Sequence, residues 1–184
     1  MGVALVSLMA APIVGAAGGW RALPSSARLM LAFGGAASLV LLGFSWRAIP
    51  GGVMAASLGH LALAVSIVAL VELGRATRVF MTDPLSAAMG GLGIGLLLVI
   101  GIFALGPLTA DLSSRQAAAL LLANPFVAVT SAAGIDLLHL DTIYRTSPLA
   151  HRGVALPAWT TACVVYAMTG LAAHGVSRLR PWSH

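Results

Sequence analysis

The stretch QAAALLLANPFVAVTSAAGIDLL, from Gln116 to Leu138, decides the fold of this chain because it is interrupted at its centre. It is long enough to cross a membrane, but Asn124-Pro125 falls in its middle and Asp136 near its end. Proline removes a backbone donor and clashes with the preceding turn of a helix. The stretch therefore predicts two short half-helices in preference to a single membrane span.

The composition is that of an integral membrane protein. Of 184 residues, 59% are hydrophobic and 8% are charged, and the mean hydropathy is +0.99. Such a chain has too little polar surface for an ordinary soluble domain. The net charge of +5 comes from arginines that fall mainly between the apolar stretches. This pattern is typical of residues that fix orientation in a membrane, and it does not predict a nucleic-acid surface.

Five apolar stretches predict transmembrane helices, since a hydrocarbon core needs roughly 20 apolar residues. They cover approximately residues 1–19, 29–45, 50–73, 84–110 and 155–177. A cleaved signal peptide is the rival interpretation of the first stretch, but that stretch lacks a basic beginning and contains Pro12.

Residue types at the predicted helix ends agree with these limits. Asp83-Pro84 predicts an N-cap followed by a proline in the first turn, and Pro157 is expected in the first turn of the last span. Tryptophan prefers the membrane interface, and all four tryptophans lie at or just beyond a predicted end: Trp20, Trp46, Trp159 and Trp182.

Counting arginines leaves two topologies level. Five spans with a cytoplasmic C-terminus place six arginines inside and four outside, and six spans with an external C-terminus give the same ratio. The proline break favours the first topology. The predicted fold is an all-α polytopic membrane helix bundle, a single transmembrane domain over residues 1–184. It has five transmembrane helices plus a re-entrant pair of half-helices, residues 116–138, between the last two.

The ionisable residues of the spans have both structural and functional interpretations. Glu72 and Arg75, three residues apart, predict a local ion pair at the inner end of a span. His60 predicts a packed, hydrogen-bonded histidine or, alternatively, an axial ligand of haem or chlorophyll. Cys163 is expected to be a small buried residue. No catalytic set or metal site is predicted.

Small residues four apart, such as Gly91 and Gly95, predict close approach between helices. The other pairs are Gly15 with Gly19 and Gly34 with Ser38. We expect these pairs to serve packing within the chain more than a dimer face.

From Asp83 onward, the order of features resembles a known family. A span after Asp83-Pro84 is followed by a stretch with Asn124-Pro125-Phe126, a polar connection with Pro148, and a final span that begins at LPAW, residues 156–159, and ends at SRLR, residues 177–180. This order resembles the C-terminal part of the permease subunits of ATP-binding-cassette exporters of the second type. The first eighty or so residues match that family only in hydropathy, and its first span has no counterpart here.

The resemblance implies a site and partners. The half-helices around Asn124, Pro125 and Phe126 would form an external gate, and the chain would end in the cytoplasm of a bacterium whose inner membrane it crosses several times. Contact with a cytoplasmic ATPase is implied for four arginines, Arg21, Arg28, Arg75 and Arg78. A second permease protomer and membrane lipids are the other expected partners. The ATPase belongs to a separate chain, because this sequence has no Walker-type glycine loop, and the chain itself needs no cofactor.

An alternative function comes from a different class. The chain is then an accessory scaffold subunit of a respiratory or photosynthetic membrane complex, either with a haem or chlorophyll held by His60 or with no cofactor role. A visible absorption band that depends on His60 separates this hypothesis from the exporter.

Overall fold

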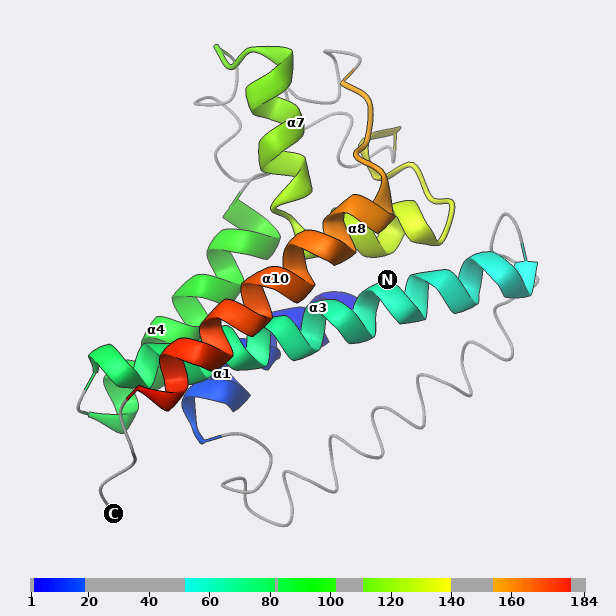
Figure 1. Cartoon of the computed structure of the whole chain (residues 1–184). Helices are drawn as coiled ribbons and strands as arrows, with labels where there is room; N and C mark the ends of the chain where they lie inside the picture. Colours follow the sequence, from blue (N-terminus) through cyan, green and yellow to red (C-terminus); the bar gives the residue numbers. More distant parts are fainter. Residues whose placement is uncertain (1, 19–51, 82, 102–110, 140–153, 180–184) are drawn as a thin grey trace.

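The structure is a computed structural model, and it describes residues 2–18, 52–81, 83–101, 111–139 and 154–179. Every regular element in these ranges is a helix, which confirms the all-α class for this part of the chain (Figure 1). The α-helices are α1 (Gly2–Ala16), α3 (Gly52–Phe80), α4 (Pro84–Leu96), α7 (Ser114–Leu122), α8 (Pro125–Ala132) and α10 (Trp159–Arg178). The π-helix η3 (Leu97–Gly101) continues α4, and the 3₁₀ helix η4 (Leu137–His139) follows α8.

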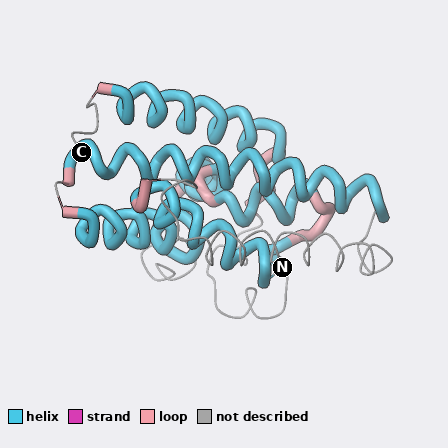
Figure 2. Tube along the Cα trace, turned by 90° about the horizontal axis from the view of Figure 1, so that it is seen from below, coloured by secondary structure: helices cyan, strands magenta, loops and turns pink. Residues whose placement is uncertain are grey.

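Helix α3 is the centre of the arrangement. It packs extensively against α10 and α1, and α1 in turn packs against α4. Figures 1 and 2 show α3 and α10 side by side, and Figure 1 shows them running in the same direction, with α8 beside the N-terminal end of α10. The short turn from α3 into α4 lies at the opposite end, together with the C-terminal end of α10.

Two of the described helical segments are long and apolar enough to cross a membrane: Gly52–Phe80, with a mean hydropathy of 2.1, and Pro84–Gly101, with 1.8. Only 33% and 22% of their apolar windows are buried within the chain. An apolar helix that leaves most of its surface uncovered is typical of a helix facing lipid. The chain therefore carries membrane-spanning features, in agreement with the predicted class.

The other predicted spans are not confirmed. Helix α1 has 15 residues and is about 22 Å long at 1.5 Å per residue, shorter than a hydrocarbon core of about 30 Å. Helix α10 has 20 residues, but Thr160, Thr161 and His174 make it less apolar. The predicted span over residues 29–45 lies outside the described residues.

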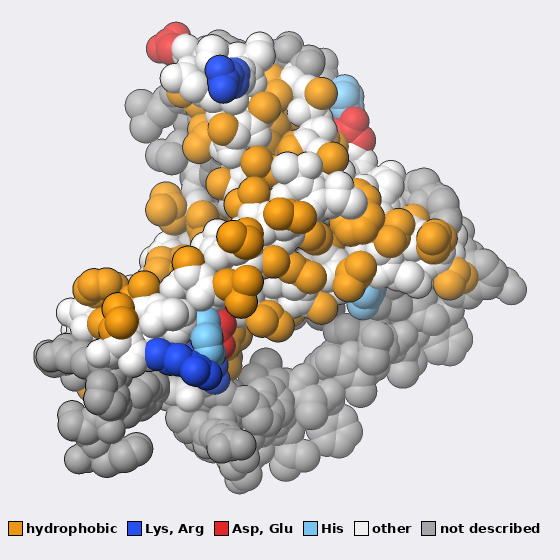
Figure 3. Space-filling model, viewed as in Figure 1, with side chains coloured by type: hydrophobic (Ala, Val, Ile, Leu, Met, Phe, Trp, Pro, Cys, Tyr) orange, Lys and Arg blue, Asp and Glu red, His pale blue; other side chains and the backbone are white. Residues whose placement is uncertain are grey.

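Charged side chains of the described part fall into two groups separated by an apolar band. One group lies where α3 and α10 end and α4 begins: Glu72, Arg75, Arg78, Asp83 and Arg178. The other lies around α7 and η4: Asp111, Arg115 and Asp136. Figure 3 shows this division on one face, with hydrophobic side chains between the two ends. The first group holds three arginines and the second holds one.

The predicted start of α4 is confirmed. The carboxylate of Asp83 accepts a hydrogen bond of 2.7 Å from the backbone nitrogen of Ser86, and Pro84 occupies the first turn. This hydrogen bond to the charged form lowers the pKa of Asp83. One other predicted limit is wrong. Pro157 precedes α10, which begins at Trp159, because Ala158 is the N-cap residue.

The residues between the predicted spans at 50–73 and 84–110 are largely helical. Helix α3 continues past the predicted limit at Leu73 to Phe80, so Arg75 and Arg78 lie on helix. At about 43 Å, this helix is longer than a hydrocarbon core of about 30 Å. Its charged last turns therefore extend beyond the apolar band.

Glycines let α1 cross α3 and α4 at backbone contact. A Cβ atom on Gly74 would lie 1.9 Å from the carbonyl oxygen of Pro12, and one on Gly91 would lie 2.7 Å from the same oxygen. A Cβ atom on Gly95 would lie 2.8 Å from the carbonyl oxygen of Met9. The prediction that Gly91 and Gly95 serve packing within the chain is confirmed.

Candidate functional site

Asn124 divides residues 116–138 into two helices, as the Asn124-Pro125 break predicts. Helix α7 ends at Leu122 and α8 begins at Pro125. The side-chain oxygen of Asn124 accepts hydrogen bonds from the backbone nitrogens of Phe126 (2.9 Å) and Val127 (3.2 Å). An N-cap asparagine followed by proline at the first helical position is a favoured helix start, so the break is a built feature of the sequence.

The amide of the same side chain reaches a different helix. Nδ2 of Asn124 donates a hydrogen bond of 3.0 Å to the carbonyl oxygen of Val99, within the π-helix η3. Asn124 is 1% exposed and Val99 is also 1% exposed, so this bond is shielded from solvent. One buried side chain therefore starts α8 and attaches it to the end of α4.

The half-helices are further attached to α10. The hydroxyl of Tyr166 donates to the carbonyl oxygen of Ala123, between α7 and α8. The hydroxyl of Ser131 donates to the carbonyl oxygen of Pro157 at 3.4 Å. Pro125 and Phe126 are buried with Asn124, so the three predicted gate residues form one buried junction among α4, α7, α8 and α10.

A charged cluster occupies the other end of the bundle. Nη1 of Arg75 lies 2.5 Å from Oε1 of Glu72, which confirms the predicted ion pair. Nδ1 of His174, on α10, lies 3.1 Å from Oε2 of Glu72. Both carboxylate oxygens are thus engaged, and the side chain of Glu72 is only 14% exposed. The cluster joins the C-terminal ends of α3 and α10.

The contact between Glu72 and His174 was not predicted. Both residues lie near the inner ends of their predicted spans, at 50–73 and 155–177, and this equal depth is the feature that identifies them as possible partners. Depth alone does not show which spans are neighbours or which helix faces meet.

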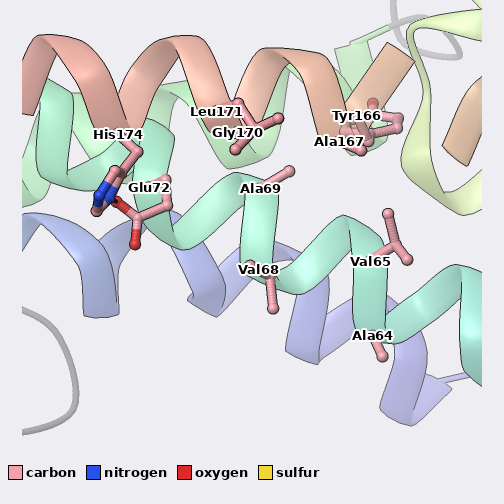
Figure 4. A pocket seen from close by; sticks show the side chains of 10 residues that line it. All are labelled: Ala64, Val65, Val68, Ala69, Glu72, Tyr166, Ala167, Gly170, Leu171 and His174. Atoms are coloured by element: carbon pink, nitrogen blue, oxygen red, sulfur yellow. Dashed lines mark hydrogen bonds and ion pairs between the residues drawn. The ribbon is translucent and has the colours of Figure 1, made fainter. Parts of the chain in front are cut away.

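A groove of about 640 Å³ runs between α3 and α10. Figure 4 shows Glu72 and His174 directed at each other at one end of the groove and Tyr166 at the other. The remaining lining residues are apolar or glycine: Ala64, Val65, Val68, Ala69, Ala167, Gly170 and Leu171. The groove is therefore apolar along most of its length and charged at one end.

The other predicted site residues are not brought into either site. Nδ1 of His60 lies 2.7 Å from the carbonyl oxygen of Ala56 on the same helix, as expected for a hydrogen-bonded histidine. Arg78 lies on α3, and Cys163 is half-buried on α10. Within the described ranges, no three His, Cys, Asp or Glu side chains are grouped as metal ligands. Arg21 and Arg28 lie outside the described residues.

No protein-family model, curated protein or solved structure matches this chain.

Proposed function

We propose that this chain is the membrane-embedded permease subunit of an ATP-driven exporter. It pairs with a second protomer to form the substrate pathway in a bacterial inner membrane, and a separate cytoplasmic ATPase supplies the energy. In this proposal the half-helices around Asn124 close the pathway on the external side. The charged end of α3 faces the cytoplasm.

The contact between Glu72 and His174 is the observation that carries the proposal. It supports a topology in which the C-terminal ends of α3 and α10 lie on the same side of the membrane. Helix α4 runs away from that side of the membrane, and α10 runs back toward it. The intervening chain, which includes α7 and α8, then makes no net crossing. The contact thus supports the re-entrant arrangement that we propose, with five spans and a cytoplasmic C-terminus.

The burial of α8 and of the break at Asn124 supports the same proposal. A broken helix at membrane depth is tolerated only where protein or water covers its freed backbone groups. Asn124 supplies two acceptor contacts and one donor contact at the break, and Tyr166 donates to the carbonyl group of Ala123. The freed backbone groups at the break are thus covered by protein, as a re-entrant pair requires.

The ATPase contact is assigned to the opposite end. Arg75 and Arg78 lie on the part of α3 that extends beyond the apolar band, where a cytoplasmic partner has access. Arg21 and Arg28 belong to the same proposal through the family resemblance alone.

Co-purification tests the proposal. Affinity purification of the tagged chain from its own membranes should recover a soluble ATPase, and reconstituted vesicles should show ATP hydrolysis coupled to transport. Replacing Arg75 and Arg78 by alanine should uncouple the two activities, whereas Arg115→Ala at the far end should leave them coupled. Unchanged coupling in the double variant, or the absence of any ATPase from the purified complex, contradicts the proposal.

The alternative scaffold function rests on His60. If Nδ1 donates to the carbonyl group of Ala56, Nε2 remains as the nitrogen that can bind a metal centre. A visible absorption band on the purified chain that disappears in His60→Ala would establish that function in place of the exporter.

A further inference from the structure

We infer that Asn124 and the π-helix η3 form a latch, which couples the position of the half-helices α7 and α8 to the helical register at the end of α4. While the amide of Asn124 donates to Val99, the turn at Leu97–Gly101 stays in π geometry. When the half-helices move, this turn closes to α geometry and its end rotates. The inference goes beyond the exporter function and holds for a scaffold subunit equally.

The π geometry of η3 has a cause outside its own sequence. Such turns are rare, and they occur mainly as single wide turns within α-helices, frequently at functional sites. Residues 97–100 are leucines, valine and isoleucine, none of which breaks a helix. A side chain that enters the ladder of backbone hydrogen bonds is a recognised cause of local distortion. Nδ2 of Asn124 is such a donor, 3.0 Å from the carbonyl oxygen of Val99 at the middle of the turn.

The wide turn holds one residue more than an α-turn. A Cβ atom on Gly101 would lie 3.7 Å from the carbonyl oxygen of Leu96, five residues earlier, whereas an α-helix stacks residues three and four apart. The preceding part of α4 is fixed against α1, because a Cβ atom on Gly95 would lie 2.8 Å from the carbonyl oxygen of Met9. Closing the turn therefore rotates its C-terminal end by one residue step, about 100°.

The carbonyl group of Val99 has a donor in both arrangements. In the latched state it accepts from Asn124, and in α geometry a carbonyl group accepts from the backbone amide four residues later. Exchange of one donor for another gives the turn two discrete states. The latched state is the more stable, because Val99 is 1% exposed and belongs to the apolar core with Leu121 and Val127. Rotation removes Val99 from this core.

Asn124 ties the turn to the half-helices. Its side-chain oxygen accepts from two backbone nitrogens at the start of α8, so the start of α8 fixes the direction of its amide. The preceding residue, Ala123, accepts from the hydroxyl of Tyr166 on α10. A displacement of α7 and α8 relative to α10 therefore withdraws the amide from Val99 and opens the latch.

Nuclear magnetic resonance of the chain in detergent micelles tests the latch at the atom concerned. Val99-Ile100 is the only place in the sequence where isoleucine follows valine. Labelling valine with ¹³C at the carbonyl carbon and isoleucine with ¹⁵N therefore gives a single cross-peak, whose ¹³C position reports the carbonyl group of Val99. Asn124→Ser keeps an N-cap acceptor but cannot reach Val99, so the peak should move. An unmoved peak overturns the inference.

A lipid-soluble paramagnetic agent distinguishes rotation from simple loss of the hydrogen bond. In the native chain Val99 is buried, so its cross-peak should keep its intensity. Closing the turn moves Val99 toward the position of Ile100, which is exposed, so the agent should broaden the peak in Asn124→Ser. A peak that moves without added broadening shows that the turn does not rotate, and it contradicts the inference.

A second pair of variants tests the coupling to the half-helices. Tyr166→Phe removes the bond to Ala123 and leaves Asn124 intact, so the peak should move in the same direction as in Asn124→Ser but by less. Thr169→Val removes an exposed hydroxyl from the same helix and should leave the peak in place. Equal positions of the peak in these two variants contradict the coupling.

Far-ultraviolet circular dichroism verifies the helical content of each variant. If Asn124→Ser does not fold, the comparison of Tyr166→Phe with Thr169→Val decides alone. The readout involves no ATPase, so the inference and the exporter function fail independently.

Discussion

Nδ1 of His174 lies 3.1 Å from Oε2 of Glu72, and this contact holds together the C-terminal ends of two helices that are about a hundred residues apart in the chain. A six-span topology with an external C-terminus places these ends on opposite sides of the membrane. A five-span topology places them on the same side. Arginine counting leaves the two topologies level, whereas the contact supports the second.

The coupling between Glu72 and His174 can be measured by a double-mutant cycle with Glu72→Gln and His174→Gln. Because the pair is partly exposed, we expect a coupling free energy of about 0.2–1 kcal/mol in unfolding from mixed micelles. A second cycle that combines Glu72→Gln with His60→Gln supplies the control, since His60 bonds to Ala56 instead. Equal coupling in the two cycles contradicts the contact.

Gly74→Ala should disrupt the crossing of α1 over α3. The added methyl group would lie 1.9 Å from the carbonyl oxygen of Pro12, and backbone atoms cannot move aside cheaply. We expect a loss of about 3 kcal/mol or more in the free energy of unfolding. The matched control is Gly93→Ala on α4, where no atom lies within 4 Å. That variant should be up to roughly 1 kcal/mol more stable to unfolding, because alanine has the higher helix propensity. Equal effects of the two substitutions on the free energy of unfolding would contradict the crossing of α1 over α3.

Replacing Asn124 should separate its two roles. Asn124→Ser keeps an N-cap acceptor but cannot reach Val99, so the buried carbonyl group loses its donor at a cost of about 1–3 kcal/mol. Asn124→Ala also loses the cap and should cost about 1 kcal/mol more. Thermal unfolding in detergent measures both. A serine variant as stable as the native chain would mean that the bond to Val99 contributes nothing.

Tyr166→Phe should loosen the attachment of α7 to α10. The phenylalanine ring keeps the packing of a residue that is 5% exposed, but the carbonyl group of Ala123 loses its donor. We expect a destabilisation of about 1 kcal/mol. Thr169→Val is the control, because it removes a hydroxyl from an exposed position on the same helix. Identical unfolding curves for native chain and Tyr166→Phe would contradict the attachment.

Local features could be predicted from the sequence because local rules decide them. The break at Asn124-Pro125, the cap at Asp83 and the ion pair of Glu72 with Arg75 each depend on residues within one helical turn. The end of α3 could not, since Arg75 and Arg78 are good helix formers and charge alone does not end a helix. The contact of Asn124 with Val99 and that of Glu72 with His174 depend on which helices become neighbours, which the spacing of residues does not encode.

The side of the membrane on which the half-helices lie is the central claim, and labelling of single cysteines in intact cells tests it most directly. Asn124 itself is unsuitable as a labelling position, because it is 1% exposed and makes three hydrogen bonds. Ser114 at the start of α7 and Asp136 after α8 are both exposed and flank the half-helices, and Ser86 in the first turn of α4 is also exposed. The three single-cysteine variants are made in a Cys163→Ser background.

A membrane-impermeant maleimide should label Ser114→Cys and Asp136→Cys in intact cells, and Ser86→Cys only after the cells are permeabilised. Labelling of Asp136→Cys only after permeabilisation, as a full span over residues 116–138 requires, would contradict the account.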